Sequence, residues 1–136
     1  MLVVDTGVIV AAADRADRHH GASAGIISDN SGSLVTTALV IAEAAYLLDR
    51  ELGPHAEAAL YTSIIDGELS VESLGPRDWF RIRELVETYA DLRLGGTDAS
   101  LVAIAERFGA TRVATLNRRH FAVVRPTHCD AFDLIP

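Results

Sequence analysis

The sequence has 136 residues, 49% hydrophobic and 23% charged, which is enough for one domain with a single core and excludes an intrinsically disordered chain. Its formal net charge of −7 argues against a passive nucleic-acid coat, because such a coat binds phosphates through many basic side chains. An enzyme that meets phosphate through a metal cation remains compatible with this charge. The basic residues are all Arg, which pairs with phosphate better than Lys does.

The cysteine content and the amino-terminal segment indicate neither secretion nor a membrane. Cys129 is the only cysteine, so no internal disulfide can form. The amino-terminal segment lacks the basic start and uninterrupted apolar stretch of a signal peptide. The longest apolar run, residues 38–48, contains Glu43 and is too short to span a bilayer. We expect a cytoplasmic protein.

Short apolar strands alternate with helices along the chain. The expected order is strand 2–4, helices 8–13 and 21–28, strand 34–36, helices 38–52 and 54–65, strand 69–71, helices 76–89 and 98–108, strand 113–116, and one or two edge strands within 122–136. Thr37 and Thr97 are expected to cap the helices that follow them, and Gly53 and Gly109 to end these helices. The alternation predicts a three-layer α/β/α sandwich around a central parallel sheet, with residues 1–136 as one domain.

Asp5 directly follows the first apolar strand. A carboxylate that is desolvated without a partner costs several kcal/mol, so an acid at this position needs an explanation. Open parallel sheets bind ligands outside the carboxyl ends of their strands, which makes Asp5 a candidate metal ligand. The alternative is a structural role as the N-cap of the helix that begins near Gly7.

Glu43 is the only charged residue in the run LVIAEAAYLL. The residues three and four positions away, which share its helix face, are apolar: Leu39, Val40, Tyr46 and Leu47. We expect this face to be buried. That expectation favours a functional role for Glu43 over an exposed position on the outer surface.

Two further polar residues stand at element boundaries. Asp98 lies at the start of a helix, where the helix dipole alone would favour an acid. Asn117 follows the fourth strand, where it is either a turn residue or a neutral ligand for a metal or a water. Arg118 and Arg119 come next and could meet phosphate.

We expect Asp5, Glu43 and Asp98 to converge at one edge of the sheet. Three carboxylates in a small space raise one another's pKa unless a cation lies between them. Ligand sets made only of oxygen suit Mg²⁺ or Mn²⁺. Such a site supports metal-assisted hydrolysis of a phosphodiester.

Taken together, four segments resemble the PIN-domain ribonucleases, and within them the VapC toxins of bacterial toxin–antitoxin pairs. The segments are VVDTGVIVAA, TTALVIAEAAYLL, YADLRLGGTDASLVAIAER and VATLNRRHFAVVRP, and the resemblance covers essentially the whole chain. It places the catalytic, metal-binding acids of the family on Asp5, Glu43 and Asp98, with Thr6 in support.

The fourth position of the family motif, commonly Asp, falls on Asn117, which removes one negative charge. Either three acids suffice and Asn117 positions a ligand or water, or this chain binds metal more weakly. A substitution introduced to quiet a toxic nuclease would look the same.

The resemblance also implies a five-stranded parallel sheet and Mg²⁺-dependent cleavage of tRNA or another structured RNA, with Mn²⁺ as a substitute cation. It implies a homodimer, and a larger heteromer with a cognate antitoxin whose carboxyl-terminal segment wraps the toxin. Arg118 and Arg119 are the candidate RNA contacts.

Three alternatives to a PIN-domain ribonuclease share parts of this pattern. A haloacid-dehalogenase-like phosphatase needs a second Asp two residues after the first, where this chain has Gly7. A receiver-type signalling domain needs a late Lys, and the chain has no Lys. A PIN-like module that has lost activity and works through protein contacts remains open because of Asn117.

Overall fold

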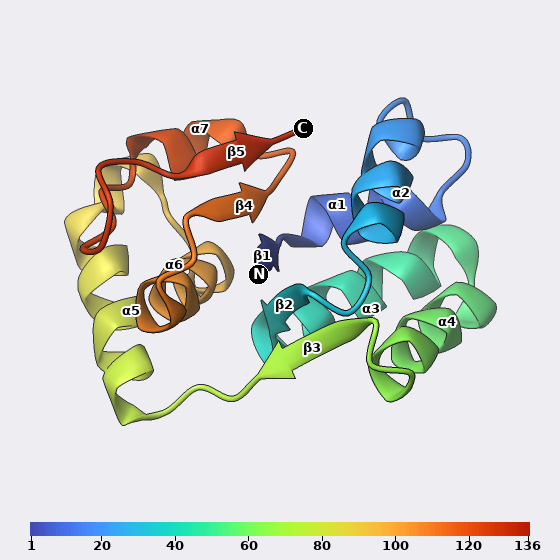
Figure 1. The fold of residues 1–136 in the computed structure, drawn as a ribbon, viewed down its shortest axis with the longest axis horizontal. Coiled ribbons are helices and arrows are strands. Elements are labelled where there is room, and N and C mark those ends of the chain that lie inside the picture. The colour runs from blue at the N-terminus through green and yellow to red at the C-terminus, as the bar shows by residue number, and fades with distance from the viewer.

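The fold is built on a central sheet of five short strands. The computed structural model describes residues 1–136, and every pair of neighbouring strands in it is parallel. The order across the sheet is β3 (Leu69–Glu72), β2 (Leu34–Thr37), β1 (Leu2–Val4), β4 (Arg112–Ala114), β5 (Asp133–Ile135). In Figure 1 helices α1 to α4 gather on one side of the molecule and α5 to α7 on the other, with the strands between them. The predicted α/β/α sandwich is confirmed.

Seven α-helices and one 3₁₀ turn connect the strands. They are α1 (Thr6–Ala13), α2 (His20–Asp29), α3 (Ala38–Leu52), α4 (Pro54–Ile65), α5 (Pro76–Thr88), η1 (Ala90–Leu92), α6 (Gly96–Phe108) and α7 (Arg118–Val123). Helix α3 has the predicted bounds because Thr37 caps it, accepting a bond from the backbone N–H of Val40 at 3.4 Å. Gly53 ends it with φ 91°, a conformation that favours glycine, and Pro54 opens α4.

Two local predictions were wrong. Thr97 does not cap α6: the extended backbone of Gly95 occupies the N-cap position, so the helix begins at Gly96 and Thr97 lies in its first turn. The fourth strand ends at Ala114 instead of continuing to Leu116, and the short helix α7 follows. Only a few residues therefore separate β4 from α7, and they lie beside the carboxyl end of β1.

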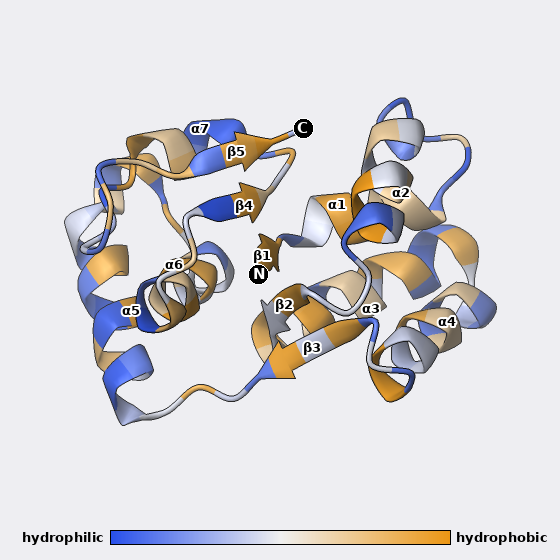
Figure 2. Cartoon of the chain, viewed as in Figure 1, coloured by the Kyte–Doolittle hydropathy of each residue, from blue (hydrophilic) through white to orange (hydrophobic).

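Close packing in the core fixes the carboxyl end of β1. Residues 2–4 are at most 1% exposed, and every residue of α6 from 99 to 105 is buried, with small side chains that allow close packing. Figure 2 shows hydrophobic residues along β1 and a mixture of hydrophobic and hydrophilic residues on the outer helices α4 and α5. Asp5 therefore emerges from the most buried strand of the molecule.

None of the helices combines the length and the apolar character needed to cross a bilayer.

Candidate active site

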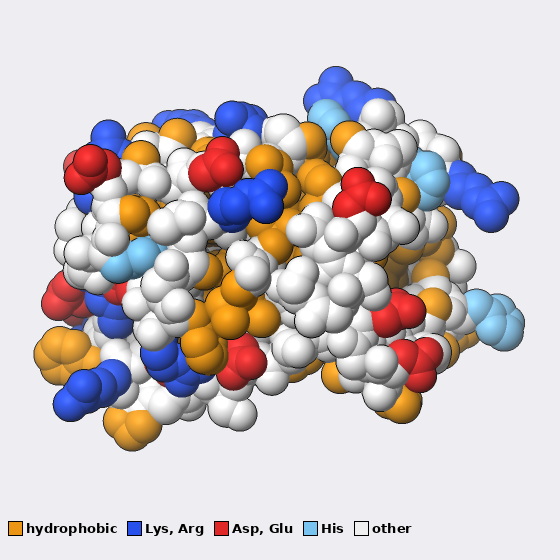
Figure 3. Space-filling view, in the orientation of Figure 1, with side chains coloured by type: hydrophobic (Ala, Val, Ile, Leu, Met, Phe, Trp, Pro, Cys, Tyr) orange, Lys and Arg blue, Asp and Glu red, His pale blue; other side chains and the backbone are white.

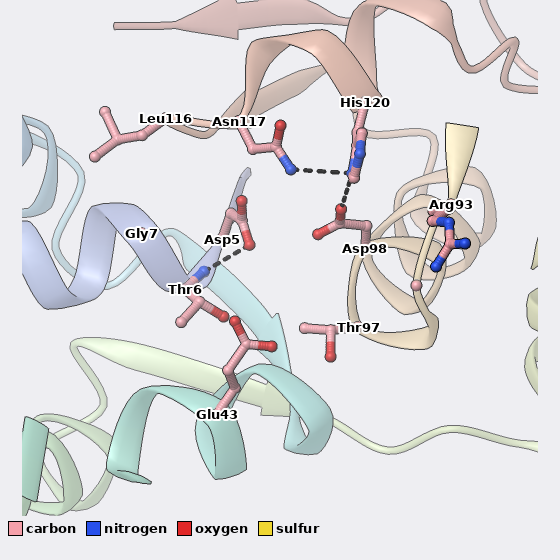
Figure 4. A pocket seen from close by; sticks show the side chains of 11 residues that line it. Asp5, Thr6, Gly7, Glu43, Arg93, Thr97, Asp98, Leu116, Asn117 and His120 are labelled. Atoms are coloured by element: carbon pink, nitrogen blue, oxygen red, sulfur yellow. Dashed lines mark hydrogen bonds and ion pairs between the residues drawn. The ribbon is translucent and has the colours of Figure 1, made fainter. Parts of the chain in front are cut away.

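A pocket of about 650 Å³ opens beyond the carboxyl ends of β1 and β4. It brings together five of the residues predicted from the sequence: Asp5, Thr6, Glu43, Asp98 and Asn117. Six further residues complete its lining: Gly7, Arg93, Gly95, Thr97, Leu116 and His120. Figure 4 shows the three carboxylates on different elements, directed toward the same space.

Asp5 has the N-cap role that its sequence position suggested, and its side chain also lines the pocket. It is the N-cap of α1, because its Oδ1 accepts the backbone N–H of Thr6 at 2.7 Å. Its Oδ2 accepts the hydroxyl of Thr115 at 2.7 Å. The side chain also lines the pocket while being only 5% exposed. Both carboxylate oxygens are thus fixed before any ligand arrives.

The environment of Asp5 disfavours its charge. The pKa of Asp5 is raised to about 6, mainly by burial and to a smaller extent by the negative charges of Asp98 and Glu43. The hydrogen bonds from Thr115 and Thr6 act in the opposite direction. A positive ion in the pocket would remove this repulsion.

Asp98 and His120 form a hydrogen-bonded pair across the pocket, and the amide of Asn117 lies beside it. His120 Nδ1 lies 2.7 Å from Asp98 Oδ2 and 3.0 Å from the side-chain nitrogen of Asn117 (Figure 4). Nδ1 carries at most one hydrogen, and a carboxylate can only accept one, so Nδ1 donates to Asp98 and has no lone pair left to accept a hydrogen bond from the amide of Asn117. The same bond leaves Oδ1 of Asp98 available to the pocket.

Glu43 reaches the pocket from a more exposed position than predicted. It lies on the exposed side of α3, next to Tyr46, whose side chain is 63% exposed. Leu39 and Leu47 are only half-buried, so the expectation that this face is buried was wrong. Of the four apolar neighbours only Val40 is buried in the core, whereas Glu43 itself lines the pocket.

Arg118 and Arg119 do not line the pocket. The guanidinium of Arg118 donates to the carbonyl oxygens of Leu134 and Pro136, which ties α7 to the end of the chain after β5. Arg119 is exposed on α7. Their contact with RNA stays a prediction.

The sequence reasoning missed three residues of the site. Thr115 is fully buried and links Asp5 to the segment before α7, accepting the backbone N–H of Asn117 at 2.9 Å. His120 lies three positions after Asn117, a spacing that places both on one side of a short helix. Arg93 lies in the turn before α6, and no pattern in the sequence marks it.

The donor set fits a divalent cation, although no three His, Cys, Asp or Glu side chains come close enough to enclose one ion. Three carboxylates share the pocket, and the buried hydroxyl Oγ1 of Thr6 has no hydrogen-bond partner. Mg²⁺ is commonly held by one or two carboxylates and keeps several waters, so it does not need an all-protein cage. A hydrated cation would satisfy both the carboxylates and the orphaned hydroxyl.

Comparison with known proteins identifies the family. Residues 2–125 match the family described as PIN domain. Ribonuclease VapC26 of Mycobacterium tuberculosis is 31% identical over 135 residues, covering 99% of this chain and all of that protein. This chain belongs to the PIN-domain family, in its VapC branch. The PIN domains are a nuclease family whose members generally depend on a divalent metal ion, and the phosphatase and receiver readings are set aside.

Solved structures share the fold of this VapC-type PIN domain. Mycobacterium tuberculosis VapC20, described as a toxin that cleaves the sarcin–ricin loop, superposes with a TM-score of 0.76 at 20% identity, over 83% of this chain and 87% of that one. VapBC2 of Rickettsia felis, solved with a promoter DNA fragment, gives a TM-score of 0.69 at 15% identity, over 99% and 98%. These likenesses agree with the parallel five-stranded sheet described above.

Proposed function

We propose that this VapC-type PIN domain is a Mg²⁺-dependent endoribonuclease that acts as the toxin of a toxin–antitoxin pair. The observation that carries the proposal is the convergence of Asp5, Glu43 and Asp98 on one pocket at the carboxyl edge of the sheet. The similarity to a named ribonuclease over the whole chain supports the same activity.

The three carboxylates would hold the cation, with Asp5 as the fixed member of the set. When bound, Mg²⁺ or Mn²⁺ neutralises charge on the phosphodiester and makes water a better nucleophile. Thr6 Oγ1, buried and unpartnered, can orient a water or an RNA oxygen beside Asp5. His120 holds Oδ2 of Asp98, so that Oδ1 faces the pocket in one orientation.

An RNA-cleavage assay at controlled metal concentrations tests the proposal. The wild-type protein, freed of metal with EDTA, is incubated with total tRNA and with an RNA hairpin carrying the sarcin–ricin sequence, and Mg²⁺ or Mn²⁺ is then added. We expect cleavage only after metal is added. No cleavage of either RNA with either cation would overturn the proposal.

A second candidate is a PIN-like module without nuclease activity. It is favoured by Asn117, which puts a neutral amide where the family commonly has a carboxylate. Under this candidate, calorimetry finds no Mg²⁺ or Mn²⁺ binding and the cleavage assay is negative. Metal binding together with cleavage excludes it.

A cognate antitoxin is the proposed protein partner, as the pairing in the Rickettsia felis complex suggests. The open acidic pocket suits an Arg side chain supplied by such a partner. Co-purification with the small protein encoded next to this gene should abolish the RNase activity, and unchanged activity would contradict the antitoxin role. A homodimer is also proposed, and sedimentation velocity on the isolated chain tests it.

A further inference from the structure

Arg93 is the only Arg among the residues that line the acidic pocket. Its guanidinium forms no ion pair with any acid of the chain. Four other arginines form ion pairs with acids of the chain: Arg50, Arg81, Arg107 and Arg112. Figure 4 shows Arg93 beyond Asp98, on the side of the pocket away from Asp5.

The backbone of Arg93 is the second observation. With φ 57° and ψ 43°, it is the only residue other than glycine with a positive φ in the chain. A side chain in this region destabilises the folded state, and Gly or Asn would be the ordinary choice. The next residue, Leu94, is 2% exposed, so the kink buries Leu94 and leaves Arg93 at the pocket. A strained residue at a ligand pocket points to a function that offsets the strain.

The negative charge of the whole chain makes a positive side chain at the pocket important for RNA. The chain carries a net charge of −7, and on the face shown in Figure 3 the Arg side chains are scattered among acidic ones instead of forming one basic patch. The three carboxylates repel the phosphates of an approaching RNA, so a positive side chain beside the pocket favours binding. Arg118, by contrast, is occupied by main-chain carbonyls.

We propose that Arg93 binds a backbone phosphate of the RNA substrate, beside the phosphodiester that is cleaved. The inference rests on the proposed nuclease function and names a substrate-binding residue for it. The planar guanidinium can pair with two phosphate oxygens, which fixes the direction of the RNA strand across the pocket.

Arg93→Gly separates this role from a structural one. Glycine removes the charge and relieves the left-handed backbone, so the thermal midpoint should stay near that of the wild type. In single-turnover cleavage of the hairpin that the wild type cuts, the half-saturating protein concentration should rise roughly threefold to tenfold, with the maximal rate changed less than twofold. The slope of the logarithm of the binding constant against the logarithm of the salt concentration should become shallower by about 0.7, the value for one phosphate contact on single-stranded nucleic acid.

Arg93→Lys and Arg15→Gln are the matched variants. Lys keeps the charge and should fall between wild type and Arg93→Gly. Arg15 is exposed, lies in the loop after α1 away from the pocket, and should behave as the wild type when changed to Gln.

An Arg93→Gly protein with wild-type half-saturation and salt slope would overturn the proposal while leaving the nuclease function standing. If the wild type cuts no RNA, the nuclease proposal fails by itself, and Arg93 is then tested by fluorescence anisotropy of a labelled hairpin in EDTA. In that measurement, equal affinity of wild type and Arg93→Gly, or no binding by either, overturns the phosphate-binding role. Weaker binding by Arg93→Gly alone supports it.

Discussion

The two walls of the acidic pocket hold their carboxylates in different ways. On one wall, Asp5 is 5% exposed and accepts hydrogen bonds through both oxygens, from Thr6 and Thr115. On the other wall, Asp98 is held by a side chain through one oxygen only, by His120. The first carboxylate is therefore part of the fold, whereas the second depends on a single partner for its orientation. We expect changes at Asp5 to alter chemistry and stability, and changes around Asp98 to alter mainly metal binding.

Asp5→Asn should have the largest effect. The change removes one charge and preserves the shape of the side chain, so the protein should remain folded. Metal ions contribute several kcal/mol of charge stabilisation in the transition state, so the rate of Mg²⁺-dependent RNA cleavage should fall about a thousandfold or more. Circular dichroism checks the fold, and a variant within tenfold of the wild-type rate would show that the site is assigned wrongly.

The stability of the metal-free protein should depend on pH through Asp5. Its pKa is about 6 in the folded protein against 3.8 unfolded, so the folded state binds the proton more tightly. The stabilisation from this proton is fully present below about pH 4 and is lost as the pH rises through 6, a decrease of up to about 3 kcal/mol. Urea unfolding of the wild type and of Asp5→Asn in EDTA, from pH 4 to 8, measures this decrease as the difference between the two.

Thr115→Val sharpens the same measurement. The hydroxyl of Thr115 lowers the pKa of Asp5, so its removal should move the pH-dependent window upward. A pH-independent difference between wild type and Asp5→Asn, or a window that Thr115→Val leaves in place, would contradict the role given to burial and hydrogen bonding at this wall.

His120→Phe tests the other wall. Phe fills a similar volume but cannot donate to Asp98, and loss of such an orienting partner typically weakens metal binding about 10- to 100-fold. His120→Asn keeps a nitrogen donor at the position of Nδ1 and should restore most of the affinity. Calorimetric titration with Mn²⁺ measures the constants, and wild-type affinity in His120→Phe would show that His120 acts only by packing.

Asn117→Asp should have the smallest effect, in the favourable direction. Asn117 is exposed, so a new carboxylate there would attract the cation through a solvent-like dielectric, with about 1 kcal/mol or roughly fivefold tighter Mg²⁺ binding. Calorimetry with Mg²⁺ measures the change. Unchanged or weaker binding would argue against a place for this position in the metal site.

The sequence was sufficient to predict an element of the fold where a local signal and the tertiary structure agree. Helix α3 has its predicted bounds because Thr37 caps it and Gly53 ends it in a conformation suited to glycine. Strand 2–4 and strand 34–36, which extends one residue further to Thr37, were recognised because both their faces are buried, which requires an apolar run. The acids of the pocket were singled out by their place beside such runs, since Asp5 follows one, Glu43 interrupts one and Asp98 precedes one.

The site residues that the sequence did not predict depend on contacts that no local pattern encodes. His120 is one of six residues in a helix too short to show an apolar period, and it meets Asp98 only because α6 and α7 converge. Arg93 looks like any surface Arg until the backbone of its turn is known. Thr97 was predicted as a cap because two glycines before it hide the true start of the helix.

The first strand of the chain lies in the middle of the sheet, and this order has a consequence for protein synthesis. Asp5 leaves the ribosome early, but its partner Thr115 follows 110 positions later, and His120 later still. A chain still being translated therefore carries its first two pocket carboxylates without the wall that faces them. The pocket can therefore be completed only after the segment that carries Thr115 and His120 has been made.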